Sequence, residues 1–227
     1  MPTEKFPHFD LSRLQPFLDD GGLLLTPNLR LSRRIKAAWD ARQLAQGRSA
    51  WQPAAVKALD HWLADCWRRA VSRGELPPDR VLDRQQEIEL WRQVIDEDRA
   101  ANGEYQLLQS ASAAESARQA RENLQRALVD TSASAVVSEF RIDPDCSIFQ
   151  RWHQAFEARL AAKGLLTASD RLVALAKSSA DIDGPRVALV DFDDVTPLHR
   201  ACLEKLASDT VELASGAGEA PLLARSY

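Results

Sequence analysis

Two short apolar runs, far apart in the sequence, constrain the fold of this chain more than any other feature. Leu23–Leu25 leads through Thr26-Pro27-Asn28, expected as a turn and N-cap, into a helical pattern, and Val187–Val190 leads through an acidic turn into another. Short apolar runs that are followed by a turn and a helix are typical of the buried strands of a parallel sheet. The sequence therefore predicts an α/β fold with a parallel sheet.

Helical spacing of apolar residues accounts for most of the remaining chain, and a further strand is expected at 210–213. A short strand around Val136-Val137 is also expected. The expected helices cover 11–20, 28–47, 53–74, 83–99, 106–130, 147–162 and 197–207. This order predicts a core made of 20–75 and 186–215 with a large helical insertion at 80–180. Three clear strands make a thin sheet, so we expect 1–227 to be the N-terminal domain of a longer protein.

The positions of the six lysines exclude two classes of catalytic site. None follows a glycine, whereas a P-loop needs Gly-Lys at the start of a helix to hold nucleotide phosphates. None stands two residues after Asp or Glu, so the nuclease motif (Asp/Glu)-x-Lys is missing as well. The four histidines show no metal-binding spacing, and no GxSxG motif occurs. We therefore expect no catalytic residue, no resident metal and no cofactor in this chain.

Composition and charge indicate a folded chain in a reducing compartment. The chain is 45% hydrophobic, contains six tryptophans and has a net charge of -4, which argues against disorder. No run of about 18 apolar residues could form a membrane-spanning helix. The three cysteines are dispersed and no secretory signal is present, so we expect a cytoplasmic protein with no membrane partner.

The segment from Asn28 to Arg48 is strongly basic, with five arginines and one lysine against a single acid, Asp40. On a helix, Arg30, Arg33 and Arg34 share one face, and the apolar stripe points away from them into the sheet. Cations in a first helical turn oppose the helix dipole by about 0.3 to 1 kcal/mol each, which a bound phosphate would offset. The alternative is a solvated face whose arginines pair with acids from elsewhere in the chain.

Tryptophan side chains could in principle stack on bases. Trp62, Trp67, Trp91 and Trp152 are in phase with other apolar residues on expected helices, which predicts that they belong to the core. Trp51 lies in a loop and is the least constrained.

Four segments, in order along the chain, carry a resemblance to a known family. They are LLLTPNLRLSRRIKAAW, GRSAWQPAAVKALDHWLADCWRRA, FQRWHQAFEARLAAKGLL and VALVDFDDVTPLHRACLEKL. Together they resemble the N-terminal region of the AddB-like bacterial "probable DNA repair proteins", over about 20–210. The resemblance implies a helicase-like domain of the P-loop NTPase type whose ATPase is degenerate. It also implies a nuclease domain outside this chain, with an iron-sulfur cluster in some members, and a helicase partner subunit.

By that resemblance, the acidic turn after Val190 takes the place of a Walker B motif. Walker B motifs carry two adjacent acids that hold Mg²⁺, whereas Phe192 separates Asp191 from Asp193 here. The resemblance therefore implies a degenerate motif. As alternatives, Asp191, Asp193 and Asp194 cap the helix that follows, or they bind Mg²⁺ weakly.

The resemblance also implies that the first strand-turn-helix contacts single-stranded DNA. Thr26 and Asn28 would donate hydrogen bonds to a backbone phosphate beside Arg30, Arg33 and Arg34. The resulting expectation is a non-catalytic domain of a DNA repair and recombination nuclease subunit, which binds single-stranded DNA without sequence preference or docks a partner helicase. The alternatives are a protein-protein scaffold that does not touch DNA and a divergent nucleotide-binding ATPase.

Overall fold

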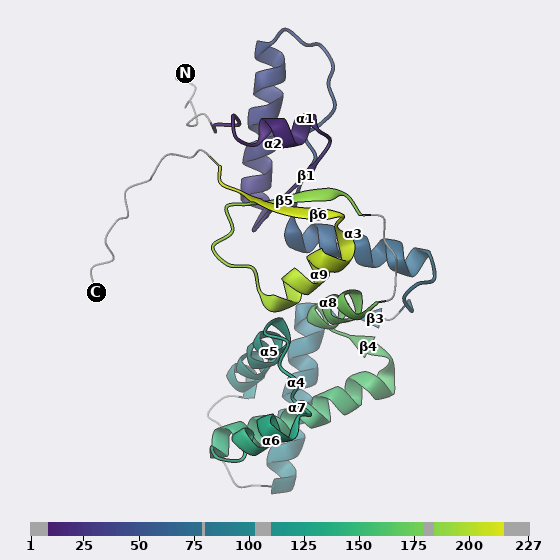
Figure 1. Cartoon of the computed structure of the whole chain (residues 1–227). Coiled ribbons are helices and arrows are strands. Elements are labelled where there is room, and N and C mark those ends of the chain that lie inside the picture. The colour runs from purple at the N-terminus through teal and green to yellow at the C-terminus, as the bar shows by residue number, and fades with distance from the viewer. Residues whose placement is uncertain (1–8, 79, 103–109, 179–183, 216–227) are drawn as a thin grey trace, which may run out of the picture. The chain divides into compact units, whose positions relative to one another are not determined.

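The computed structural model describes residues 9–78, 80–102, 110–178 and 184–215 (Figure 1). The chain divides into two compact units. Unit 1 comprises Met1–Arg69, Asp181–Val195 and Leu203–Tyr227, and unit 2 comprises Ala70–Ala180 and Thr196–Cys202. Each unit contains its own cluster of buried apolar side chains.

Unit 1 is built on a four-stranded sheet in which every strand runs parallel to its neighbours, in the order β2-β1-β5-β6. The strands are β1 (Leu23–Thr26), β2 (Val56–Ala58), β5 (Arg186–Val190) and β6 (Asp209–Leu213). Leu24 of β1 lies opposite Val56 on one side and opposite Ala188 on the other. The structure therefore confirms the expected α/β class with a parallel sheet.

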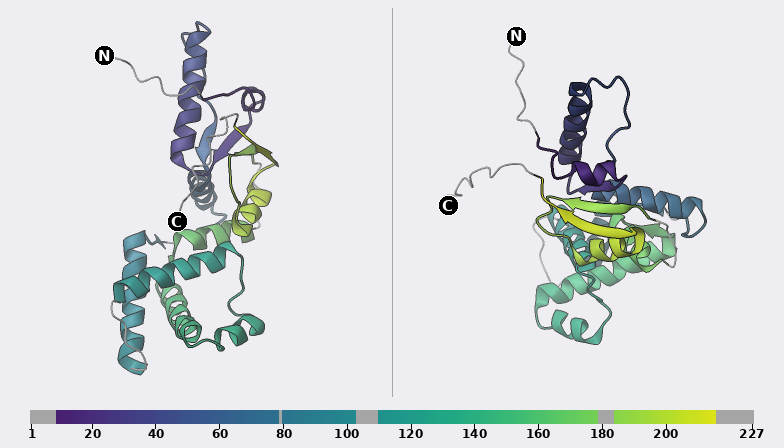
Figure 2. Two further views of the ribbon diagram at one scale, coloured as in Figure 1. Left: turned by 90° about the vertical axis from the view of Figure 1, so that its left-hand side faces the viewer. Right: turned by 45° about the horizontal axis from the view of Figure 1, so that its top comes forward.

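One face of this sheet is covered by two helices, α1 (Gln15–Asp19) and α2 (Leu29–Ala45). Helix α2 follows directly from the end of β1 (Figure 2). Its residue Ile35 is fully buried in a cluster with Leu24 and Val56 from the sheet. Helix α3 (Leu59–Ser72) follows β2, and helix α9 (Pro197–Leu206) connects β5 to β6.

Unit 2 is mainly helical and contains a two-stranded parallel sheet. Its strands are β3 (Arg80–Val81) and β4 (Leu165–Leu166). Its helices are α4 (Arg84–Asn102), α5 (Ser110–Arg126), α6 (Ser134–Phe140), α7 (Pro144–Lys163) and α8 (Ala168–Lys177). In its core Trp91 stacks on Phe156 with 4.0 Å between ring centroids. Trp152 is also buried here, and Trp62 and Trp67 are buried on α3, so the four tryptophans expected to be internal are confirmed as such.

The structure corrects three expectations about secondary structure. Val56 was expected on a helix because it is in phase with the apolar stripe of α3, but it pairs with β1 as part of strand β2. The expected strand at Val136-Val137 is wrong, because both residues lie in helix α6. Helix α8 was not expected, although Thr167 and Asp170 form a capping box that marks its start.

A buried guanidinium group ties three helices of unit 2 together. Arg121 of α5 is only 1% exposed. It donates hydrogen bonds to Glu157 of α7 at 2.7 Å, to Asp170 of α8 at 2.6 Å and to the Thr167 hydroxyl at 3.0 Å. Because removal of one partner from a buried ion pair costs roughly 3 to 5 kcal/mol, this network fixes how α5, α7 and α8 pack.

Glu87 of α4, 7% exposed, gives unit 2 a specific pH dependence. Burial raises its pKa from 4.5 to about 7, although Arg121 and Arg118 oppose the shift. Since the pKa is higher in the folded state, Glu87 favours folding below about pH 4.5, and this contribution is lost as the pH rises through 7. We expect Glu87→Gln to be more stable than the parent at pH 8 by about 2 kcal/mol, with a smaller difference at pH 5.

Urea unfolding of both proteins at the two pH values measures this difference. Glu89→Gln is the matched control, because Glu89 lies on the same helix with a half-exposed side chain that pairs with Arg92. A free-energy difference between the parent and Glu87→Gln that does not change with pH would contradict the assignment.

Candidate nucleic-acid interface

The turn between β1 and α2 is held by two polar side chains. Asn28 is the N-cap of α2, and its Oδ1 accepts a hydrogen bond from the Leu31 N–H at 2.9 Å, as expected. Thr26 is fully buried, and its hydroxyl donates to the Asn28 carbonyl oxygen at 2.9 Å. Thr26 therefore stabilises the turn from inside and does not present its hydroxyl at the surface, whereas Asn28 is exposed.

The three arginines of the expected basic face are all exposed, and Ile35 on the opposite side of α2 is fully buried. Within the described residues, no carboxylate oxygen lies within 4.0 Å of Arg30, Arg33 or Arg34. Arg34 instead places its guanidinium carbon 5.5 Å from the centre of the Phe9 ring. The first turn of α2 contains no acidic residue, so its positive end adds to the charge of these side chains.

The single acid of this basic segment is engaged elsewhere. Asp40 accepts a hydrogen bond from the Trp51 indole N–H at 2.7 Å. The Trp39 indole N–H donates to the Gln52 carbonyl oxygen at 3.1 Å. The sequence did not predict a role for Trp51. Its hydrogen bond to Asp40 holds the loop after α2 against the helix. Asp40 does not form an ion pair with Arg30, Arg33 or Arg34.

A hollow of about 480 Å³ lies at strand β2, between residues of α2 and residues of α3. Its charged lining consists of Lys36, Lys57 and Arg68 with one carboxylate, Asp65. The Lys57 ammonium lies 2.6 Å from the Asp65 carboxylate, and Arg68 pairs with the same carboxylate. The sequence did not predict this hollow, because Lys57 was expected on a helix. The alternation of Val56, Lys57 and Ala58 was the available signal for a strand with one polar side.

The acidic turn after β5 has a structural role. Asp191 has a positive φ of 52°, and its carboxylate accepts hydrogen bonds from the Ser215 N–H at 2.7 Å and from the Ser215 hydroxyl. The Asp191 N–H donates to the Leu213 carbonyl oxygen at 3.3 Å. In the first turn of α9, the His199 N–H is bonded to the Thr196 hydroxyl at 3.4 Å. Asp191 therefore joins the end of β5 to the end of β6 and does not cap α9.

The other two aspartates of the turn, Asp193 and Asp194, are exposed. In the described part of the chain, no three His, Cys, Asp or Glu side chains come together in a way that could hold a metal ion.

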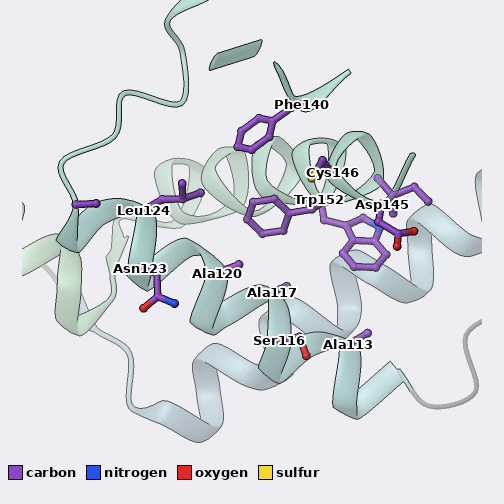
Figure 3. A pocket seen from close by; sticks show the side chains of 13 residues that line it. Ala113, Ser116, Ala117, Ala120, Asn123, Leu124, Phe140, Asp145, Cys146 and Trp152 are labelled. Atoms are coloured by element: carbon purple, nitrogen blue, oxygen red, sulfur yellow. The ribbon is translucent and has the colours of Figure 1, made fainter. Parts of the chain in front are cut away.

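Unit 2 has a larger hollow of about 730 Å³ between α5, α6 and α7 (Figure 3). Small side chains of α5 form one wall, and Phe140, Phe149 and Trp152 contribute aromatic surface. Asp145, Asn123 and Ser116 are polar groups in an otherwise mainly apolar lining. This arrangement suits an apolar ligand or peptide segment and not a polyanion.

Comparison with known proteins assigns no family to the chain, since no family model and no curated protein matches it. Among the described residues, no helix has the length and apolar character needed to cross a membrane.

A structural role for Asp191, through its bond to Ser215, and a role in binding Mg²⁺ predict different results for its substitution. We expect Asp191→Ala to lower the free energy of unfolding by about 1 to 3 kcal/mol, because it leaves the buried Ser215 without its hydrogen-bond acceptor. Asp193→Ala, at an exposed position of the same turn, should change it by about 0.5 kcal/mol or less. Thermal unfolding with and without Mg²⁺ tests both variants. Stabilisation of the parent by Mg²⁺ that Asp191→Ala abolishes would instead assign a metal site.

Proposed function

We propose that this chain is a non-catalytic, helicase-like domain of a DNA repair and recombination nuclease subunit. In this proposal, the first turns of α2 bind the backbone of single-stranded DNA. One observation carries the proposal: Arg30, Arg33 and Arg34 are exposed together, with no ion-pair partner among the described residues. Guanidinium groups without an ion-pair partner near the positive end of a helix attract phosphate groups.

The arrangement of these charges favours an extended polyanion over a small one. The three side chains lie along the outside of a helix rather than around an enclosed cavity, so they suit a ligand with repeated charges. The tryptophans nearest to them in the sequence, Trp39 and Trp51, are both held by hydrogen bonds from their indole N–H groups. With both of these tryptophans held in this way, we expect binding to depend on phosphate contacts, which predicts weak and sequence-independent affinity.

The remaining features support a domain without nucleotide turnover. The turn after β1 reads Thr-Pro-Asn where a P-loop would have Gly-Lys, so it lacks the amine that reaches terminal phosphates. Asp191, in the place of a Walker B acid, has its carboxylate committed to Ser215. A nuclease centre, with its metal or iron-sulfur cluster, would therefore belong to a part of the protein outside this chain. The Thr-Pro-Asn turn and Asp191 therefore do not support the alternative of a divergent ATPase.

The scaffold alternative is favoured by a different feature, the hollow between α5, α6 and α7. An apolar segment of a partner helicase subunit could dock there without any contribution from α2. The two proposals make different demands on the arginines, because only DNA binding requires them.

Our prediction is that replacing Arg30, Arg33 and Arg34 together by Ala flattens the dependence of log affinity on log salt by about 2 units. This value assumes one phosphate per arginine at roughly 0.7 per contact on single strands. Fluorescence anisotropy of a labelled oligo(dT), titrated at several salt concentrations, provides the measurement. Folding should persist, because the replaced side chains are exposed.

The matched control removes three exposed cations of unit 2, Arg73, Arg141 and Lys163, and so reproduces the change in net charge. Its slope should equal that of the parent. If both triple variants behave alike, binding reflects net charge only, and the scaffold role becomes the better explanation.

A further inference from the structure

The hollow at β2 differs from the open arginine face because its walls come from three elements. Leu29, Ser32 and Lys36 of α2 form one wall. Lys57 lines the hollow from β2, and Arg68 is the last lining residue on α3. Strand β2 has only one neighbour within the described sheet, so the hollow lies at a sheet edge.

The charges in this hollow are unbalanced. Asp65 is shared between Lys57 and Arg68, and the hydrogen bond from Lys57 holds the pKa of Asp65 below its usual value. The Asp65 carboxylate therefore pairs with two cations and balances the charge of only one. Lys36, the third cation, has no ion-pair partner among the described residues. The lining therefore keeps an excess of positive charge that an anion would balance.

Ser32 adds an independent indication of a ligand. Its side chain lines the hollow although the residue is only 3% exposed. In the described part of the chain, its hydroxyl has no hydrogen-bond partner. Among the described residues, the Ser32 hydroxyl does not belong to the fully buried polar atoms that lack a partner, so it is accessible from the hollow. A free hydroxyl beside several cations is suited to donate to an oxyanion.

We infer that this hollow binds one phosphate group, held by Lys36, Lys57 and Arg68 and by the Ser32 hydroxyl. A phosphate offers several acceptor oxygens, which matches a set of donors that comes from different elements. A single carboxylate would leave part of this set unused.

The phosphate is assigned to a nucleic-acid backbone, and this assignment rests on the proposed function. Arg33 follows Ser32 directly on α2 and lies about 60° from Lys36 around the helix axis. A strand bound along the arginine face would therefore bring a neighbouring phosphate to the hollow. The other source of the same chemistry is a free phosphate or a mononucleotide.

The first measurement is a titration of the whole chain with inorganic phosphate at constant ionic strength, followed by backbone amide chemical shifts. We expect saturable shifts at Ser32, Lys57 and His61, and about tenfold weaker binding in Lys36→Gln. Loss of one charge-assisted hydrogen bond costs about 1.5 kcal/mol, which corresponds to this factor. Ser32→Val, which removes the hydroxyl without changing the charge of the hollow, should also weaken binding. The exposed Lys36 variant keeps the test valid if Ser32→Val fails to fold.

The second measurement is the salt dependence of oligo(dT) binding for Lys36→Gln, with Lys163→Gln as the matched control. We expect the slope to fall by about 0.7 in the first variant only. An unchanged slope, with phosphate shifts still present, would overturn the nucleic-acid assignment in favour of a free phosphate compound. Absence of saturable shifts would overturn the inferred site itself. Neither result decides the role of the α2 arginines, because the triple variant tests that role separately.

Discussion

Ile35 is fully buried against the sheet, among Leu24, Val56, Ala188 and Val190. Burial of a side chain of this size contributes about 1.5 to 3 kcal/mol, and it fixes the rotation of α2 about its own axis. Once Ile35 faces the sheet, residues on the far side of the helix must face solvent. The exposed arginine face and the Ser32–Lys36 wall of the hollow are both consequences of this one packing contact. The candidate interface is therefore positioned by the core of unit 1 and not by a loop.

Local patterns in the sequence predicted the features that depend on a single element. Asn28 was expected as an N-cap because a cap needs only its own turn, and the structure agrees. The exposure of the arginines was expected because it follows from helical periodicity. Apolar periodicity gave the wrong secondary structure where pairing between distant segments decides whether a helix or a strand forms. Val56 fits a helical stripe as well as a strand, and only its register with Leu24 settles which one forms.

Features that depend on several elements could not be predicted from the sequence. The hollow joins α2, β2 and α3, and nothing in the order of residues indicates that Lys36 and Arg68 share it. Asp191 was expected to cap a helix or to bind Mg²⁺ because the next helix and the other acids of the turn lie nearby in the sequence. Its observed partner, Ser215, is 24 residues away. In unit 2, the network around Arg121 spans 36 to 49 residues for the same reason.

Unit 2 has a different chemical character from the α2 surface. Its buried guanidinium group is matched, since Arg121 faces both Glu157 and Asp170, and its hollow between α5, α6 and α7 is mainly apolar. Such a unit is suited to packing against protein, whereas the first turns of α2 and the hollow at β2 carry unmatched positive charge. Phosphate recognition and partner docking would thus use separate surfaces of the chain.

Hydrogen exchange of the whole chain, with and without a saturating oligo(dT) at low salt, tests the central claim most directly. If the α2 surface and the hollow bind the nucleic-acid backbone, exchange should slow in the first turns of α2 and in 56–68. It should be unchanged in the buried helices of unit 2, and the protection should disappear as salt is raised. Protection confined to α5 and α7, or an absence of protection at α2 while the oligonucleotide is bound, would contradict the account.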